Sequence, residues 1–294
     1  MRGSSGRLGG PRPRLKPRRG GGDAGLAAAA AGRYTEPGRR ATHRVATRPK
    51  EAALGDRLGV GGAGRLGVTI AVRDEAAAIL AEPAFRWEEG PRGVLRSARY
   101  PISLMLSGVG KAYAARAAAI LAAECGALCP MGTAGGLSDE PVGTLYLCER
   151  AVEHDMDVSG LGFAPGITPF AAMDGPELGG LSPAWRATFK GALADAGLSY
   201  AEGLVASGDR FLADPAVAAA VRTGFGAALA DMESAAVAKV AMLEGLSFCT
   251  LRWISDNADH DSPTDWPTQV ARSSDSFRRA LLALGERLVS KVPG

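Results

Sequence analysis

Residues 66–290 alternate between short apolar runs and longer helix-forming segments, and this alternation is what most constrains the fold. The first run, 66–72, reads Leu-Gly-Val-Thr-Ile-Ala-Val, an apolar and partly β-branched pattern typical of a buried strand. Further strands are predicted at 102–106, 127–131, 144–152, 201–206 and 248–254, and helices at 74–81, 111–124, 183–197, 214–223, 234–244 and 268–290. This order predicts an α/β fold, a three-layer α/β/α sandwich around a mixed, mainly parallel central sheet.

The first 65 residues have a different composition, with 15 Gly, 5 Pro and scattered Arg. Such a segment has too little apolar surface to offset its chain entropy, so we predict a disordered tail over 1–65 and a single domain over 66–294. Three origins of the tail remain open: a start site assigned too early or an artificial extension, a natural basic tail, and a transit peptide. Deleting residues 1–64 is expected to leave the fold and the activity intact.

The charge of the chain is divided unevenly between these two parts. Residues 1–65 hold 15 of the 34 Lys and Arg and 4 of the 31 Asp and Glu, which leaves 19 basic and 27 acidic residues for the rest. The predicted domain is therefore acidic, and the pI of about 8.7 does not indicate a nucleic-acid-binding surface on it.

Several classes of protein lack support in the sequence. No run of about 18 apolar residues predicts a membrane-spanning helix, and we expect a cytoplasmic protein. The four Cys show no zinc-site spacing, so buried free thiols are the simpler interpretation, and no metal or cofactor is expected. No P-loop is present, and no GxGxxG pattern opens a predicted helix, so a dinucleotide fingerprint is absent as well.

Acidic and Gly-rich segments follow or flank the predicted strands, where α/β sheets bind their ligands. Glu75 follows the first strand, and Gly-Thr-Ala-Gly-Gly at 132–136 follows the third. Asp231 and Glu233 precede a helix, and Asp256 follows the last strand. Each carboxylate alone is more often a solvated group or a helix cap, so only their combination indicates a site.

The order of these segments resembles the nucleoside phosphorylase/nucleosidase superfamily, and within it most the 5′-methylthioadenosine/S-adenosylhomocysteine nucleosidases. The resemblance covers about 66–290. It rests on Glu75, Gly-Thr-Ala-Gly-Gly at 132–136, His-Asp-Met-Asp-Val at 154–158, Ser-Gly-Asp-Arg-Phe at 207–211, Asp-Met-Glu at 231–233 and Ser-Asp-Asn-Ala-Asp at 255–259.

The resemblance implies three catalytic residues. Asp256 matches the general acid that protonates N7 of adenine, because cleavage of the N-glycosidic bond builds negative charge on the base. Glu75 matches the carboxylate that activates water against the anomeric carbon. Glu233 matches the residue that holds the ribose hydroxyls and stabilises the oxocarbenium-like sugar.

The same resemblance implies a set of binding residues for a small nucleoside substrate. Phe211 would stack on adenine, the Leu212 backbone would read its edge, Met232 would pack under the ribose, and Arg252 would orient the carboxylates. The set is completed by Thr133, Ala134, Gly135 and Ser255, and by Leu161 and Pro169, which would reach into a neighbour's site in a homodimer. The segment around His154 is structural in the family and is not expected to bind metal.

Departures from the family pattern keep alternatives open. Asp231 stands where Glu is frequent, and Thr133 where Ser is common. Arg73 lies two residues before Glu75, and a phosphorylase needs Arg to bind phosphate. We expect the turn to begin at Arg73 and send its side chain to solvent. Hydrolysis of a 5′-thio-substituted adenine nucleoside is thus the leading hypothesis. The alternatives are phosphorolysis, hydrolysis of a futalosine-type or hopanoid-linked nucleoside, and a catalytically silent binder.

Overall fold

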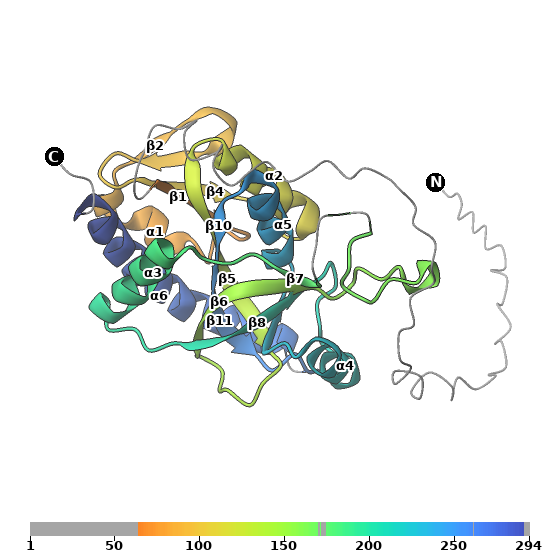
Figure 1. The fold of residues 1–294 in the computed structure, drawn as a ribbon. Coiled ribbons are helices and arrows are strands. Elements are labelled where there is room, and N and C mark those ends of the chain that lie inside the picture. The colour runs from red at the N-terminus through yellow and green to blue at the C-terminus, as the bar shows by residue number, and fades with distance from the viewer. Residues whose placement is uncertain (1–63, 170, 172–174, 261, 291–294) are drawn as a thin grey trace, which may run out of the picture. The chain divides into compact units, whose positions relative to one another are not determined.

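The computed structural model describes residues 64–169, 171, 175–260 and 262–290, and all of them belong to one compact unit (Figure 1). The predicted tail lies outside the described residues up to residue 63. Its disorder, and the domain boundary at 65, stay predictions.

One mixed sheet contains every strand of the described part of the chain (Figure 1). The strands are β1 (Arg65–Ile70), β2 (Trp87–Glu89), β3 (Leu95–Ser97), β4 (Ile102–Leu106), β5 (Cys125–Gly136), β6 (Leu145–Glu153), β7 (Glu177–Leu178), β8 (Ala201–Ser207), β9 (Leu229–Asp231), β10 (Ser247–Phe248) and β11 (Thr250–Asp256). Parallel pairs join β1 to β4 and β5, β5 to β10 and β11, and β8 to β6 and β9. The hydrogen-bonded order is β11-β6-β8-β9-β5-β1-β4-β3-β2.

The sheet also closes on itself, because β11 pairs in parallel with β5 and antiparallel with β6. Strands β5, β9, β8, β6 and β11 therefore form a ring, and β1, β4, β3 and β2 extend it on one side. The closure brings the carboxyl ends of β1, β5, β9 and β11 together, and the site is built there.

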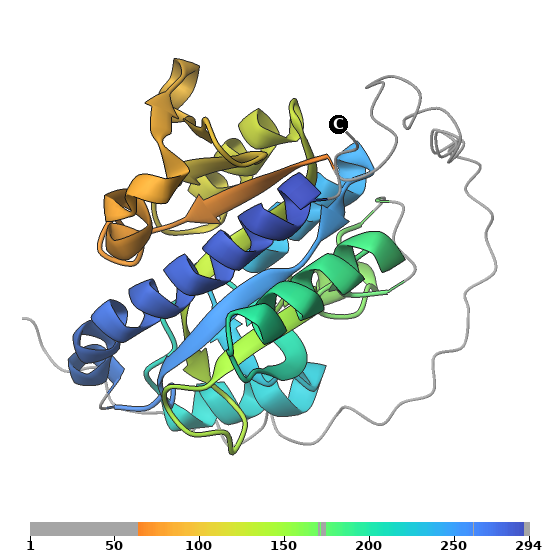
Figure 2. The ribbon, with the colours of Figure 1, turned by 90° about the vertical axis from the view of Figure 1, so that its left-hand side faces the viewer.

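Helices cover both faces of the sheet (Figure 2). On one face, α6 (Ser262–Ser290) contacts β5 and β11 and packs against α1 (Ala77–Ala81) and α3 (Pro183–Asp195). On the other, α2 (Lys111–Ala122) and α5 (Ser234–Glu244) pack on each other and on β5. Their facing residues are mostly Ala, which permits a close approach of the two helices. Helix α4 (Pro215–Phe225) begins at the side-chain cap of Asp214 and packs beside β8.

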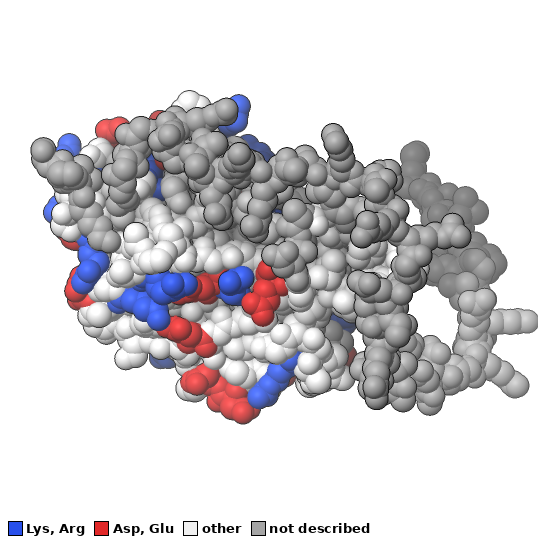
Figure 3. All heavy atoms as spheres, in the orientation of Figure 1, with Lys and Arg blue, Asp and Glu red and all other residues white. Residues whose placement is uncertain are grey.

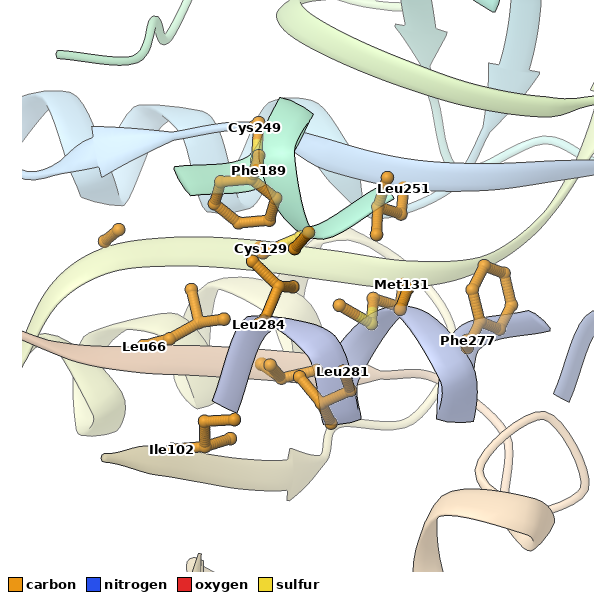
Figure 4. Close-up of a cluster of buried hydrophobic side chains, with 14 of the residues drawn as sticks. Leu66, Ile102, Cys129, Met131, Phe189, Cys249, Leu251, Phe277, Leu281 and Leu284 are labelled. Atoms are coloured by element: carbon orange, nitrogen blue, oxygen red, sulfur yellow. The ribbon is translucent and has the colours of Figure 1, made fainter. Parts of the chain in front are cut away.

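The largest apolar core lies between the sheet and the α3–α6 layer (Figure 4). Leu66, Cys129 and Leu251 of the strands meet Phe189 of α3 and Phe277 of α6, and all five are fully buried. Each of the Leu and Phe side chains stabilises the fold by roughly 1.5–3 kcal/mol relative to full exposure. All four cysteines are free and buried, as the sequence predicts.

The α/β sandwich and its mainly parallel centre are confirmed, but several element ends differ from prediction. The segment 132–136 continues β5 as a strand, since β9 and β11 pair with it. Asp231 and Asp256 are the last residues of β9 and β11, where they were expected in loops. Helix α6 begins at Ser262, six residues before the predicted start.

Charge is mixed on the face of the molecule drawn in Figure 3, where basic and acidic side chains lie next to each other. Among the ion pairs of the described residues, Arg186 lies 2.5 Å from Glu149 and Lys190 lies 2.6 Å from Glu202. Within the described part of that face, no large surface of a single sign stands out. In the same part of the chain, no helix has both the length and the apolar character needed to cross a membrane.

Candidate active site

A cavity of about 290 Å³ opens at the carboxyl ends of β1, β5, β9 and β11. It is of the size at which small-molecule sites begin, about 300 Å³. Its walls are formed by Ala71, Val72, Glu75, Val109, Thr133, Ala134, Gly135, Arg210, Phe211, Leu212, Ala230, Asp231, Met232, Glu233, Arg252, Ser255, Asp256 and Trp266.

Glu75 is buried in the turn between β1 and α1, where two donors fix its carboxylate. The backbone N–H and the side-chain hydroxyl of Thr133 both donate to Oε1, each at 2.7 Å. Gly132 lets this carboxylate and Arg252 pack closely on β5, because an added Cβ would lie 3.1 Å from Glu75 Oε2 and 2.8 Å from Arg252 Nη1. The second half of β5 therefore holds Glu75 by its backbone as well as by its side chains.

Arg252 on β11 is the buried cation of the site, with 2% of its side chain exposed. Its Nη2 lies 2.8 Å from Asp231 Oδ2 and 3.6 Å from Glu233 Oε2. Burial lowers the pKa of Arg252, but Asp231, Glu233 and Glu75 raise it by a larger amount, so the guanidinium stays charged. Ser207 and Ser234 donate to Asp231, which satisfies this buried carboxylate.

Glu233, directly before α5, is a buried carboxylate of the cavity wall. Its Oε1 accepts the backbone N–H of Gly110 at 3.0 Å. Burial raises the pKa of Glu233 to about 7, with Asp231 and Glu75 adding to the rise and Arg252 and Gly110 opposing it. The side chain is thus poised to change its protonation state near neutral pH.

Asp256 is the last residue of β11 and is 1% exposed. The Ser255 hydroxyl donates to its Oδ2 at 2.7 Å, and the backbone N–H of Ala258 donates to its Oδ1 at 3.0 Å. Ala258 takes a left-handed backbone conformation (φ 53°), which is unusual for a residue with a Cβ. The chain thus turns sharply after β11 so that its own backbone aims Asp256.

The loop that carries Phe211 is tied to the amino end of α2 by a polar network. Asp209 Oδ1 accepts the backbone N–H of Lys111 at 2.8 Å, and Asp155 Oδ2 accepts that of Asp209 at 2.8 Å. Lys111 Nζ binds Glu153 at 2.8 Å and Asp155 at 2.7 Å. Because Lys111 follows Gly110, this network also holds the N–H that binds Glu233.

The cavity brings together all the site residues named from the sequence except Leu161 and Pro169. Leu161 lies in a short 3₁₀ helix and is 70% exposed, and Pro169 is partly buried. Arg73 is exposed in the turn that begins at that residue and does not line the cavity, as predicted. Among the described residues no group of His, Cys, Asp and Glu side chains is arranged to hold a metal ion.

Some wall residues were not named from the sequence, and Trp266 is the most informative of them. The sequence placed residue 266 in a loop before the last helix, whereas α6 already includes it. Its indole Nε1 donates to the Thr133 hydroxyl at 2.8 Å. The sequence signal that could have identified this residue was its position, only ten residues after Asp256 at the end of the last predicted strand.

Known proteins that resemble this chain identify its family. The family model of the phosphorylase superfamily matches residues 65–290. A 5′-methylthioadenosine/S-adenosylhomocysteine nucleosidase of Shewanella frigidimarina is 30% identical over 190 residues, which span 62% of this chain and 80% of that protein. The nucleosidase of the same name from a Marinomonas species is 35% identical over 167 residues, 55% of this chain and 71% of its own length.

Solved structures of nucleosidases share the fold. A Helicobacter pylori nucleosidase mutant with 5′-methylthioadenosine in its active site matches with a TM-score of 0.69 and 26% identity, over 77% of this chain and 99% of that one. A futalosine hydrolase mutant of the same organism also matches with a TM-score of 0.69 and 26% identity, over 76% of this chain and 99% of that one. The resemblance read from the motifs is therefore confirmed. The chain belongs to the phosphorylase superfamily, and it is an N-glycosidase of the nucleosidase kind.

Proposed function

We propose that this enzyme hydrolyses the N-glycosidic bond of a 5′-thio-substituted adenine nucleoside, such as methylthioadenosine or S-adenosylhomocysteine, to adenine and a thioribose. The observation that carries the proposal is the convergence of three buried carboxylates, Glu75, Glu233 and Asp256, on one nucleoside-sized cavity. The names of relatives support the substrate class, because the Shewanella frigidimarina and Marinomonas proteins are 5′-methylthioadenosine/S-adenosylhomocysteine nucleosidases.

In the proposed reaction the bond between N9 of adenine and C1′ of the ribose breaks. Asp256 gives a proton to N7, so that the base leaves as neutral adenine. Glu75 accepts a proton from a water molecule whose oxygen adds to C1′. Glu233 accepts hydrogen bonds from the ribose hydroxyls and balances the positive charge that develops on the sugar.

The chemistry of the cavity walls assigns each protein side chain to a part of the substrate. Phe211 is 48% exposed at the cavity and can stack on a base, while the buried Leu212 presents its backbone to the base edge. Met232, Thr133, Ala134 and Gly135 line the ribose side in this proposal, and Ser255 holds Asp256. The apolar Val72 and Val109 suit an alkylthio group.

Water, and not phosphate, is the proposed nucleophile. Among the described residues lining the cavity, the cations are Arg210 and Arg252. Arg252 is engaged by Asp231 and Glu233, and the exposed Arg73 does not reach the cavity. Glu75 would also repel a phosphate ion, by about 4 kcal/mol for unit charges 4 Å apart at an effective dielectric of about 20.

The test is product analysis with methylthioadenosine, with and without phosphate. We expect free methylthioribose under both conditions, and Glu75→Ala should abolish it without rescue by phosphate. A 1-phosphate product that is lost in Arg73→Ala would assign a phosphorylase instead. Futalosine should be tested in the same assay, because the structure of a futalosine hydrolase matches this chain as well as that of the nucleosidase does. If futalosine is cleaved faster than methylthioadenosine, futalosine becomes the proposed substrate.

We further propose a cytoplasmic homodimer that acts in methionine salvage. Support for the dimer comes from apolar side chains left exposed near the cavity: Val109 at 49%, Tyr113 at 61% and Phe211 at 48%. Leu161 and Pro169 lie outside their own chain's cavity and would cover that of the partner. Light scattering should give twice the monomer mass, and Leu161→Asp should raise KM if the partner completes the site.

A further inference from the structure

We infer that Trp266 is a positioning residue of the reaction, which orients the catalytic Glu75 through the hydroxyl of Thr133. The inference rests on the proposed function, because it assigns Glu75 the task of activating water. It is carried by a continuous chain of two hydrogen bonds, from the Trp266 indole to Thr133 Oγ1 at 2.8 Å and from Thr133 Oγ1 to Glu75 Oε1 at 2.7 Å.

The direction of this chain follows from the donors available. An indole N–H can only donate, and a Thr hydroxyl has one proton and two acceptor lone pairs. Since Trp266 donates to Thr133 Oγ1, the indole occupies one lone pair there. The single hydroxyl proton of Thr133 is then directed to Glu75 Oε1, the carboxylate oxygen within reach.

The consequence for Glu75 is an asymmetric carboxylate. The Thr133 backbone N–H also donates to Oε1, at 2.7 Å, so both hydrogen bonds from Thr133 converge on that oxygen. Oε2 is thereby the oxygen left to accept a proton from water. Loss of the indole N–H frees the Thr133 hydroxyl to rotate, and the carboxylate is then held firmly by only one of its two hydrogen bonds from Thr133, the one from the backbone N–H.

Trp266 is suited to this role by its place in the fold. It lies near the amino end of α6, just after the segment that aims Asp256, and it lines the cavity. Its ring forms a wall of the cavity while its N–H reaches β5. One side chain therefore links the helix that follows the proposed acid to the proposed base.

A double-mutant cycle tests the inference with methylthioadenosine as the probe and adenine release as the readout. Trp266→Phe keeps an aromatic wall and removes the N–H, so kcat should fall about 3- to 10-fold, the usual worth of one hydrogen bond, while KM stays within about twofold. Thr133→Val should lower kcat at least as much. The double variant should be no slower than Thr133→Val, because Trp266 acts through the hydroxyl that is already gone.

Trp253→Phe is the matched control. Trp253 on β11 donates its indole N–H to Gln269 of α6, the helix that also carries Trp266, at 3.4 Å, and it does not line the cavity. Its kcat should stay within about twofold of the wild type. Thr133→Ser, which keeps the hydroxyl, should retain the full effect of Trp266→Phe and serves as a second background if Thr133→Val does not fold.

The inference would be overturned, with the proposed function left standing, by a kcat that is unchanged in Trp266→Phe, whether or not KM changes, or by losses that multiply in the double variant. An equal loss in Trp253→Phe would also overturn it, because anchoring of α6 would then be the cause. A wild-type enzyme that releases no base from methylthioadenosine refutes the proposed function itself, and the inference with it.

Discussion

The raised pKa of Glu233 predicts that the folded protein loses stability as the pH rises toward and through neutrality. Burial moves this pKa from 4.5 to about 7 in the folded state. The folded protein therefore holds the Glu233 proton more tightly than the unfolded chain does. Its contribution to stability is fully present below about pH 4.5 and is lost as the pH rises through about 7.

The magnitude follows from the two pKa values. At pH of about 5.5 the proton on Glu233 stabilises the folded state by about 2 kcal/mol relative to pH of about 8.5, where the group is ionised in both states. Glu233→Gln mimics the protonated carboxyl at every pH. Its stability advantage over the wild type should therefore grow by about 2 kcal/mol between about pH 5.5 and about pH 8.5.

Urea unfolding of the two proteins across this pH range measures the effect as a difference, so other titrating groups cancel. Glu82→Gln is the matched control, because backbone and Arg278 hydrogen bonds lower the pKa of Glu82 and keep it ionised throughout. The difference in unfolding free energy between Glu82→Gln and the wild type should not change with pH. A pH-independent gap in stability between wild type and Glu233→Gln would refute the reasoning.

The acid limb of kcat/KM should also lie near pH 7, since an ionised Glu233 is needed to accept hydrogen bonds from the ribose hydroxyls.

Asp256→Asn should lower kcat by about 10²- to 10⁴-fold and preserve binding of an adenine nucleoside by calorimetry, because an amide can hydrogen-bond to N7 but cannot deliver a proton; a kcat near wild type would remove Asp256 from the mechanism. Arg252→Met should cost about 3–5 kcal/mol of stability in urea unfolding, since it leaves Asp231 buried without its cation. Near-wild-type stability would contradict that account. Lys111→Met should cost about 1–3 kcal/mol, because it removes the cation that Glu153 and Asp155 share, whereas Lys190→Met, at a more exposed ion pair, should stay within about 0.5 kcal/mol.

The sequence predicted the framework of the site more closely than the shapes of the elements around it. Helix α5 and strand β4 have the predicted bounds, because their apolar patterns end abruptly at turn residues. The strands β2, β3, β7 and β9 were missed, since each is only two or three residues long and owes its pairing to neighbours distant in the chain. The predicted roles of the site residues remain to be tested by the variants above.

By itself, the sequence determined the α/β class, the chemistry available at the strand ends and the family, because these depend on residue type, period and order along the chain. Only the tertiary structure decided how those residues act on one another. Closure of the sheet through β11 places Arg252 between Asp231 and Glu233, and their shared burial sets the pKa of Glu233. The contact of Trp266 with Thr133 joins residues 133 positions apart. Desolvation and long-range hydrogen bonds of this kind arise from packing in three dimensions, which no local pattern of residues records.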